Sequence, residues 1–136
     1  MHLSTHLQFS GQCEAAFRFY EKCLGGKISF LLTYGDSPMA QQAPPDWQKK
    51  ITHASFALGE QTLSGADSWA EHYRAPQGFS VVLEIKAPAE AERIFKLLAE
   101  NATIQMPIQE TFWAQRFGML VDQFGIPWMI NCSKRV

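Results

Sequence analysis

The sequence predicts an α+β fold built from two βαβββ modules in tandem. Three observations lead to this prediction. A strand, a helix, a left-handed turn and a second strand follow one another near the N-terminus, the same succession returns 76 residues later, and each copy is followed by a β-hairpin. We treat residues 1–136 as one domain, with module one at 1–70, a linker at 71–78 and module two at 79–136.

The spacing of apolar side chains predicts the first strand and the first helix. Residues 3–9 alternate apolar and polar, with His6 and Gln8 on the polar face, which is typical of a half-buried strand. Residues 12–24 then place apolar side chains at helical spacing, namely Ala16, Phe19, Tyr20 and Cys23. Gly25 supplies the left-handed cap, because glycine takes a positive φ without steric cost. A second strand is predicted at 27–33.

The second copy repeats this order at one offset. The matches are Leu7 with Leu83, Phe9 with Ile85, Glu14-Ala15 with Glu90-Ala91, Phe19 with Phe95, Ile28 with Ile104 and Leu32 with Ile108. Asn101 stands where Gly25 stands, and asparagine is the next-best left-handed residue. Pro88 begins the second helix, where its missing N–H has no partner to lose. Because strand, helix, cap and strand share one spacing, we interpret the pattern as a duplication.

Each copy is expected to end in a hairpin. In the first copy, 50–58 and 61–66 flank Gly59-Glu60, and in the second, 116–122 and 126–132 flank the turn at 123–125. The later hairpin is apolar on both faces, which predicts that a ligand or a partner subunit covers its second face. The loop at 35–49 is long for a compact domain, and it is interpreted as a lid, a dimer contact or a mobile segment.

Composition excludes several classes of protein. The formal net charge is −1 and no basic stripe precedes the terminal Lys134-Arg135, which argues against nucleic-acid binding. No apolar run approaches the roughly 18 residues of a membrane helix, and the first residues lack the apolar core of a signal peptide. Three cysteines without CxxC spacing predict reduced thiols and a cytoplasmic protein.

Several motifs together resemble one known family. They are the run FSGQCEAAFRFY at 9–20, His53, Asp67, Met106-Pro107, Trp113 and the stretch DQFGIPW at 122–128. They resemble the vicinal oxygen chelate superfamily of glyoxalases, bleomycin-resistance proteins and extradiol dioxygenases, and within it the PhnB-like branch, often labelled demethylubiquinone methyltransferase-like. The resemblance implies a curved mixed sheet around an open, barrel-like cleft, with the helices outside, usually in a homodimer.

The resemblance also implies where a metal would be held. In metal-using relatives, a His or Gln on the first strand of each module and a Glu on the last strand bind a divalent ion that polarises the substrate's oxygens. Here the carboxylate position of module two falls on Met129, whose soft, neutral thioether replaces a hard oxygen ligand poorly. The equivalent position of module one falls near Ser64, and His6 is matched by Val82. The usual metal site is therefore not predicted.

Other residues are candidates for binding or chemistry in the cleft. The predicted cleft set is His6, Gln8, His53, Ser64, Trp113, Arg116 and Met129. Glu84 is a candidate general base if it is buried, because desolvation raises the pKa of a carboxyl group; otherwise it is solvated or paired with an Arg. Arg116 is a candidate for binding a carboxylate or phosphonate, or alternatively forms a surface ion pair.

The aromatic and acidic residues near the second hairpin have plainer interpretations beside the functional ones. Trp113 is a candidate for stacking a ligand at the cleft rim, whereas Trp128 is expected to pack in the core. Asp122 is expected to cap backbone amides at its turn, and Asp67 has the same interpretation.

These observations lead to one leading function and two alternatives. The leading hypothesis is a homodimeric module that binds a small, partly apolar molecule between its modules without a metal. The first alternative is a metal-dependent lyase, isomerase or dioxygenase with a two-His-one-carboxylate site at His6, His53 and Glu84. The second is a dimer whose cleft is residual. No glycine-rich turn follows a strand, so S-adenosylmethionine binding is not predicted, and no other cofactor is.

Overall fold

The computed structural model describes residues 1–69 and 71–134, and the chain divides into two compact units, Met1–Arg74 and Ala75–Val136. Unit one contains β1 (Thr5–Phe9), α1 (Cys13–Leu24), β2 (Lys27–Thr33), the 3₁₀ turn η1 (Pro45–Trp47), β3 (Ile51–Leu58) and β4 (Gln61–Asp67). Unit two contains β5 (Val81–Glu84), α2 (Pro88–Leu98), β6 (Thr103–Gln109), β7 (Ala114–Val121) and β8 (Pro127–Ser133). The predicted α+β class and the tandem βαβββ order are confirmed.

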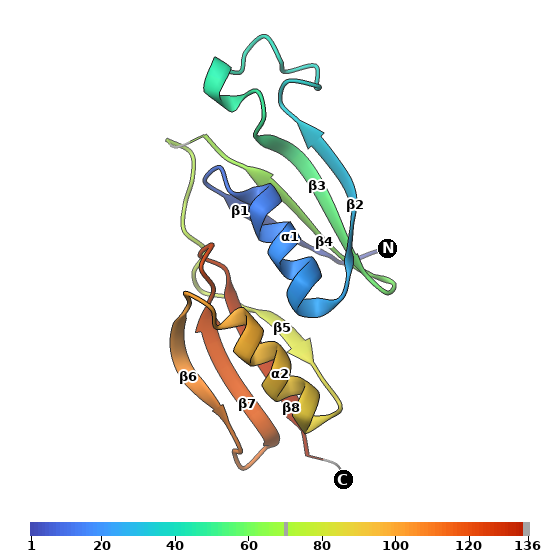
Figure 1. The fold of residues 1–136 in the computed structure, drawn as a ribbon, viewed down its shortest axis with the longest axis vertical. Coiled ribbons are helices and arrows are strands. Elements are labelled where there is room, and N and C mark those ends of the chain that lie inside the picture. The colour runs from blue at the N-terminus through green and yellow to red at the C-terminus, as the bar shows by residue number, and fades with distance from the viewer. Residues whose placement is uncertain (70, 135–136) are drawn as a thin grey trace. The chain divides into compact units, whose positions relative to one another are not determined.

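Each unit is a four-stranded mixed sheet covered by one helix (Figure 1). The strand order is β1-β4-β3-β2 in unit one and β5-β8-β7-β6 in unit two. In both, the first strand pairs in parallel with the last, and the other pairs are antiparallel. In each unit, one face of the sheet lies under the helix; we call the other the open face.

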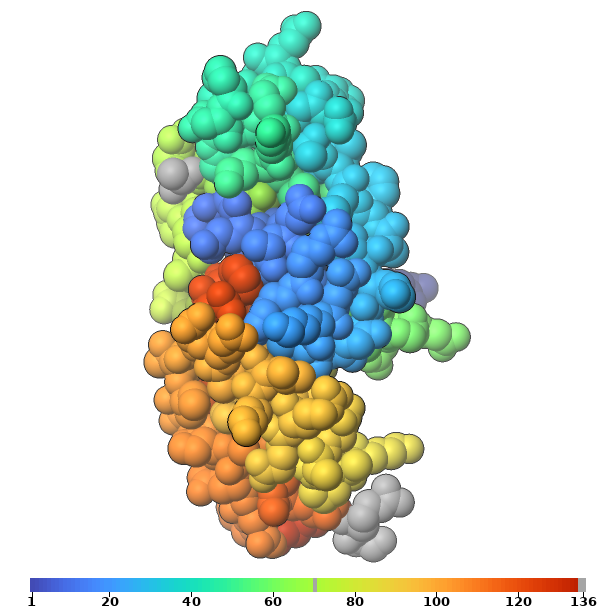
Figure 2. Space-filling model, in the orientation of Figure 1, coloured from blue at the N-terminus to red at the C-terminus, as the bar shows by residue number. Residues whose placement is uncertain are grey.

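The core of unit one lies between α1 and its sheet. Leu7 and Phe9 of β1 are buried against the helix, and α1 buries Cys13, Ala16, Phe17, Tyr20 and Cys23. The expected inward position of Phe19 is therefore wrong: Phe17 takes it, with its ring 6.0 Å from the ring of Phe9. Gly65 makes room for Phe17, because a Cβ there would lie 2.8 Å from the Phe17 Cζ. In Figure 2, α1 lies in front of the middle of the sheet, and atoms of the edge strand β2 are visible beside it.

The duplication is visible in the structure, although the residues of the two helices correspond at a different offset from those of the strands. The buried helix residues correspond as Ala16 with Ala91, Tyr20 with Phe95 and Cys23 with Leu98. This offset is one residue shorter than the strand offset, so the predicted matches in the helix, such as Phe19 with Phe95, are wrong by one position. Gly25 and Asn101 both take a left-handed φ, +82° and +55°, as expected. The extra residue is absorbed in the turn after α2.

The loop between β2 and β3 is tied to the body of unit one. The rings of Tyr34, Trp47 and Trp69 lie 5.0–5.9 Å apart, and the Tyr34 hydroxyl donates to the Asp67 carbonyl at 2.8 Å. Gln48 Nε2 donates to two carbonyls within the same loop, at 2.8 Å each. These contacts hold both ends of the loop.

Two buried aspartates cap backbone amides, as expected. Asp67 accepts N–H bonds from Gly11 and Cys13 at one oxygen and from Ile51 at the other, at 2.9–3.0 Å. Burial raises the pKa of Asp67, although these donors oppose the shift. Asp122 receives N–H bonds from the β7–β8 turn. Both residues are therefore structural.

Three further sequence predictions concern the position of Trp128, the state of the cysteines and the presence of membrane-spanning helices. Trp128 is 1% exposed, so its expected place in the core is confirmed. All three cysteines are buried and free, and burial raises the pKa of Cys13 far above its ordinary value. Within the described residues, no helix has the length and apolar character needed to span a bilayer.

Candidate functional site

The open face of the first sheet is polar. Strand alternation puts Leu7 and Phe9 under α1, so that His6 and Gln8 point to the opposite side. His6 pairs with Ser64 in β4, Ser64 with Ser55 in β3, and Ser55 with Phe30 in β2. Four strands thus contribute to a single cross-sheet row, which includes two of the predicted cleft residues.

His6 and His53 lie close enough to affect one another. His6 Nδ1 is 2.7 Å from the Ser64 hydroxyl oxygen, and the His53 ring packs 5.6 Å from the ring of Phe30. Partial desolvation, and then the charge of His53, lower the pKa of His6 below its ordinary value. The neutral form of His6 is therefore favoured. Gln8 lies on the same face, so the first module brings together all four of its predicted cleft residues.

The open face of the second sheet is largely apolar and is hollowed. Val82 of β5 pairs with Met129 of β8, and Met129 pairs with Met119 of β7. A groove of about 500 Å³ lies over this row; its apolar walls include Phe79, Val82, Met119, Val121, Pro127 and Met129. The volume is within the range of small-molecule sites, about 300–1,000 Å³. The predicted cleft residue Met129 is therefore a groove residue.

Glu84 lies two residues beyond Val82 on the same face and is held by Asn131. The Asn131 amide nitrogen lies 2.9 and 3.2 Å from the two Glu84 oxygens, and 3.1 Å from the Ser133 hydroxyl. Glu84 is exposed, so the condition set for a general base, burial, is not met. Among the described residues, no cation forms an ion pair with this carboxylate, so the Arg-paired alternative is not observed either.

Asn131 was missed as a site residue by the sequence reasoning. Its amide oxygen is buried and has no hydrogen-bond partner among the described residues. Leaving a buried acceptor unpaired costs about 1–3 kcal/mol. The opposite amide orientation would bring this oxygen against the Glu84 carboxylate, so Glu84 fixes the orientation. The alternation from Met129 to Asn131 could have indicated its face, but not its partner.

Trp113 belongs to an aromatic cluster next to Asn131. Phe117 pairs with Asn131 across β7 and β8, and the Trp113 ring lies 5.2 Å from the ring of Phe117. Phe112 packs on Trp113 at 4.7 Å, and their exposed fractions are 88% and 44%. A partly exposed indole face of this kind can stack a flat group.

Arg116 lies on the other side of this sheet. Its Nε donates to the Glu92 carboxylate of α2 at 2.8 Å, and it lies on the same face of β7 as Gly118 and Leu120, which pack under the helix. The expected position of Arg116 with Met129 on one face is therefore wrong, and the alternative, a surface ion pair, is what forms. The helix, rather than a ligand, occupies the space in front of the guanidinium group.

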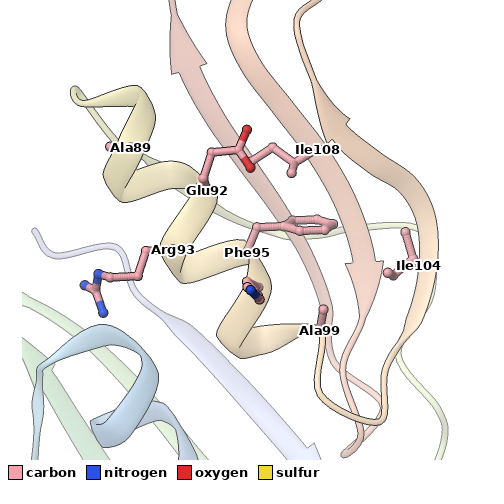
Figure 3. A pocket seen from close by; sticks show the side chains of 8 residues that line it. Ala89, Glu92, Arg93, Phe95, Ala99, Ile104 and Ile108 are labelled. Atoms are coloured by element: carbon pink, nitrogen blue, oxygen red, sulfur yellow. The ribbon is translucent and has the colours of Figure 1, made fainter.

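A second hollow lies on the helix side of unit two, between α2 and the edge strand β6 (Figure 3). Its volume is about 580 Å³, and Phe95, Ile104 and Ile108 contribute its apolar surface. Two of the charged side chains at its rim form ion pairs, Glu92 with Arg116 and Arg93 with Glu90 at 2.8 Å, and Lys96 also lines it. The groove on the open face, by contrast, ends at Val82 and Met129, and Glu84 follows Val82 by two residues on the same face of β5.

The positions that correspond to the metal ligands of relatives form two cross-strand pairs, His6 with Ser64 and Val82 with Met129. This donor set contains one imidazole, one hydroxyl and two apolar side chains, which does not suit a divalent ion that relatives bind through carboxylates. In the described part of the chain, no group of three or more His, Cys, Asp and Glu is arranged to hold a metal. Other residue types thus occupy the usual ligand positions, and the described residues form no alternative group of ligands elsewhere.

Comparison with known proteins agrees with this architecture. The model of the Glyoxalase/Bleomycin resistance protein/Dioxygenase superfamily matches residues 2–130. Protein YjdN of Escherichia coli (strain K12) is 34% identical over 143 residues, which cover 99% of this chain and 97% of that protein.

Two solved structures are similar over almost the whole chain. Protein PA1353 from Pseudomonas aeruginosa is 40% identical with a TM-score of 0.90, covering 99% of each chain. The PhnB protein from Bacillus cereus is 24% identical with a TM-score of 0.83, covering 98% of this chain and 100% of that one. The resemblance to this superfamily, predicted from the sequence motifs, is confirmed, and the chain shares its fold with a PhnB protein.

Proposed function

Because this chain belongs to the glyoxalase/bleomycin resistance protein/dioxygenase superfamily, we propose that it binds a small, partly apolar molecule without the superfamily's usual metal site. The superfamily covers several activities, so membership alone does not choose among them. The choice rests on the side chains that this chain presents on its open sheet faces.

The observation that carries the proposal is the groove over the second sheet. Val82, Met119 and Met129 form an apolar row across three strands, and the groove over them measures about 500 Å³. Methionine side chains are flexible and polarisable, so they adapt to apolar ligands of different shapes. An apolar surface of this kind gains free energy when a ligand displaces water from it.

The second candidate function is a metal-dependent lyase, isomerase or dioxygenase that uses His6, His53 and Glu84. One observation favours it: His53 precedes Ser55 by two residues on β3, and Ser55 stands in the same cross-sheet row as His6, so both imidazoles lie on one sheet face. Against it, Nδ1 of His6 is engaged with Ser64, and Glu84 is bound by Asn131. Elemental analysis after exposure to Zn, Ni, Mn and Fe(II) separates the two functions. Stoichiometric metal that is lost in His6→Ala and His53→Ala would favour the enzyme.

The binding function is tested by methionine-methyl NMR. The chain has five methionines, so ¹³C-methyl labelling gives few signals. Assignment uses single Met→Leu variants. In a screen of flat, partly apolar fragments, we expect the Met119 and Met129 signals to shift together, while exposed Met39 of unit one serves as the internal reference. A Met129→Lys variant should abolish the response. The proposal is wrong if no fragment moves these two signals.

We also propose that the protein is a cytoplasmic homodimer. Its three cysteines are free and buried, which suits a reducing compartment. Exposed apolar side chains such as Phe30, Phe79 and Phe112 suit a partner surface. Light scattering after gel filtration tests this: a mass of one chain across micromolar concentrations would contradict the dimer.

A further inference from the structure

We propose that the groove over the second sheet selects a cationic ligand, and that Glu84 receives the ligand's ammonium group while the apolar row holds its body. This inference rests on the proposed binding function and names its ligand class. It also gives Glu84 a binding role, in place of the general-base role considered from the sequence.

The first step of the argument is the position of Glu84. It follows Val82 by two residues on the same face of β5, and its cross-strand partner Asn131 follows Met129 by two residues on β8. Two residues of a strand span about 6.6 Å, so the carboxylate lies about one small functional group beyond the apolar row. A ligand lying on Val82 and Met129 therefore reaches Glu84 with a short side arm.

The second step is the way the carboxylate is held. One Asn131 N–H group faces both Glu84 oxygens, at 2.9 and 3.2 Å, and the carboxylate keeps lone pairs for other donors. Holding it this way leaves the Asn131 amide oxygen buried and unpaired. An unpaired acceptor of this kind lowers the free energy of unfolding. The same arrangement fixes the direction of the Glu84 carboxylate before any ligand binds. Asn131 is thus a positioning residue for Glu84.

The third step is charge. Two cations of β7 and the end of β8 in the described part of the chain form ion pairs elsewhere: Arg116 pairs with Glu92, and Lys134 pairs with Glu110 at 3.1 Å. Lys86 follows Glu84 by two residues but forms no ion pair with it within the described residues. Among the described residues, the Glu84 carboxylate therefore has no ion-pair partner, and it lies two residues beyond the groove residue Val82.

The fourth step is the aromatic neighbour. Phe117 lies opposite Asn131, and Trp113 covers Phe117 with a partly exposed indole ring. An ammonium group gains a charge-assisted hydrogen bond from the carboxylate, and a flat apolar body that extends past Asn131 toward Phe117 can stack on the indole. A carboxylate or phosphate ligand would instead be repelled by Glu84. The chemistry at this end of the groove thus favours amines over acids.

The experiment compares three probes that share an indole ring: tryptamine, tryptophol and indole-3-propionate. Binding is measured from the shifts of the Met119 and Met129 methyl signals at low salt and at 0.5 M NaCl. We expect tryptamine to bind at least tenfold more tightly than tryptophol and indole-3-propionate to bind most weakly. High salt should reduce the preference for the amine, because part of it is electrostatic.

Variants identify the group responsible. Glu84→Gln keeps the shape but removes the charge, and it should reduce the preference for tryptamine to about that of tryptophol. Asn131→Ser should weaken tryptamine binding but leave tryptophol binding unchanged, as expected for a positioning residue. Glu100→Gln, an exposed carboxylate after α2, makes the same change in net charge and should leave all three affinities unaltered.

The outcomes separate this inference from the proposed function. Equal binding of tryptamine and tryptophol, or a preference that survives Glu84→Gln, overturns the inference but leaves small-molecule binding intact. If no probe shifts the Met119 and Met129 signals, the inference is overturned, and the fragment screen then decides the broader function. If Glu100→Gln lowers tryptamine affinity as much as Glu84→Gln does, general charge attraction replaces the specific contact, and the inference is also wrong.

Discussion

The indole N–H of Trp128 donates to the Asp122 carboxylate at 2.8 Å, across the tight turn that joins β7 and β8. The other Asp122 oxygen accepts the backbone N–H groups of Phe124 and Ile126, at 2.8 and 3.0 Å. One buried carboxylate thus fixes the turn and, at the same time, satisfies the only polar group of a buried indole. This contact ties the turn to the start of β8, the strand that carries the groove residue Met129.

Replacing Asp122 by Ala should destabilise the protein strongly. Three donors, two of them buried, lose their acceptor, so we expect the free energy of unfolding to fall by roughly 3–5 kcal/mol. Urea denaturation followed by circular dichroism measures this. The matched control is Gln123→Ala in the same turn, an exposed position where a change within about 0.5 kcal/mol is expected. Equal stability of the two variants would show that the carboxylate does not hold the turn.

The pH dependence of stability should report on His6. Because its pKa is lowered in the folded protein, the unfolded chain binds the proton more readily below the ordinary value of 6.5. The free energy of unfolding should therefore fall as the pH falls through 6.5, and the loss should end below the folded pKa. At higher pH this contribution is fully present.

The cause of that shift can be tested directly by an NMR titration of the imidazole signals. Replacing His53 by Gln removes the neighbouring charge, so the pKa of His6 should rise toward 6.5 without reaching it, since desolvation remains the larger cause. His72→Gln, at an exposed position, should leave the His6 titration unchanged. A His6 pKa that ignores the His53 substitution would disprove the coupling.

The Arg116–Glu92 pair should contribute little to stability and nothing to ligand binding. Its side chains are 37% and 48% exposed, so solvent screens the attraction. A double-mutant cycle with Arg116→Ala and Glu92→Ala should give a coupling of about 0.2–1 kcal/mol. In the methionine-methyl assay, Arg116→Ala should bind groove ligands as the wild type does. A tenfold loss of affinity would restore Arg116 to the ligand site.

Gly118 should resist even a single added methyl group. A Cβ at this position would lie 2.6 Å from Cε2 of Phe95 and 3.1 Å from the Cα of Ile108. We expect Gly118→Ala to lower the free energy of unfolding by about 1–3 kcal/mol, because a packed core tolerates overpacking poorly. The same change made in a Phe95→Leu background should cost less. An unchanged cost would mean that the clash with Phe95 is not the cause.

Local pattern was enough to predict the elements of this fold. Alternation at 3–9 and helical spacing at 12–24 depend on backbone periodicity, and the left-handed turns at Gly25 and Asn101 depend on local sterics. These are short-range effects, so a sequence displays them directly. The capping role of Asp122 and the burial of Trp128 followed in the same way from a turn and its neighbours.

Only the tertiary structure decided which face of each sheet the helix covers and which side chains meet across strands. The sequence predicts Arg116 in the cleft with Met129, but β7 puts it on the face that α2 covers, where it pairs with Glu92. The burial of Phe17 in place of Phe19 has the same origin, because packing against the sheet sets the rotation of a helix about its axis. The Glu84–Asn131 contact joins residues 47 positions apart, a pairing that local periodicity cannot specify.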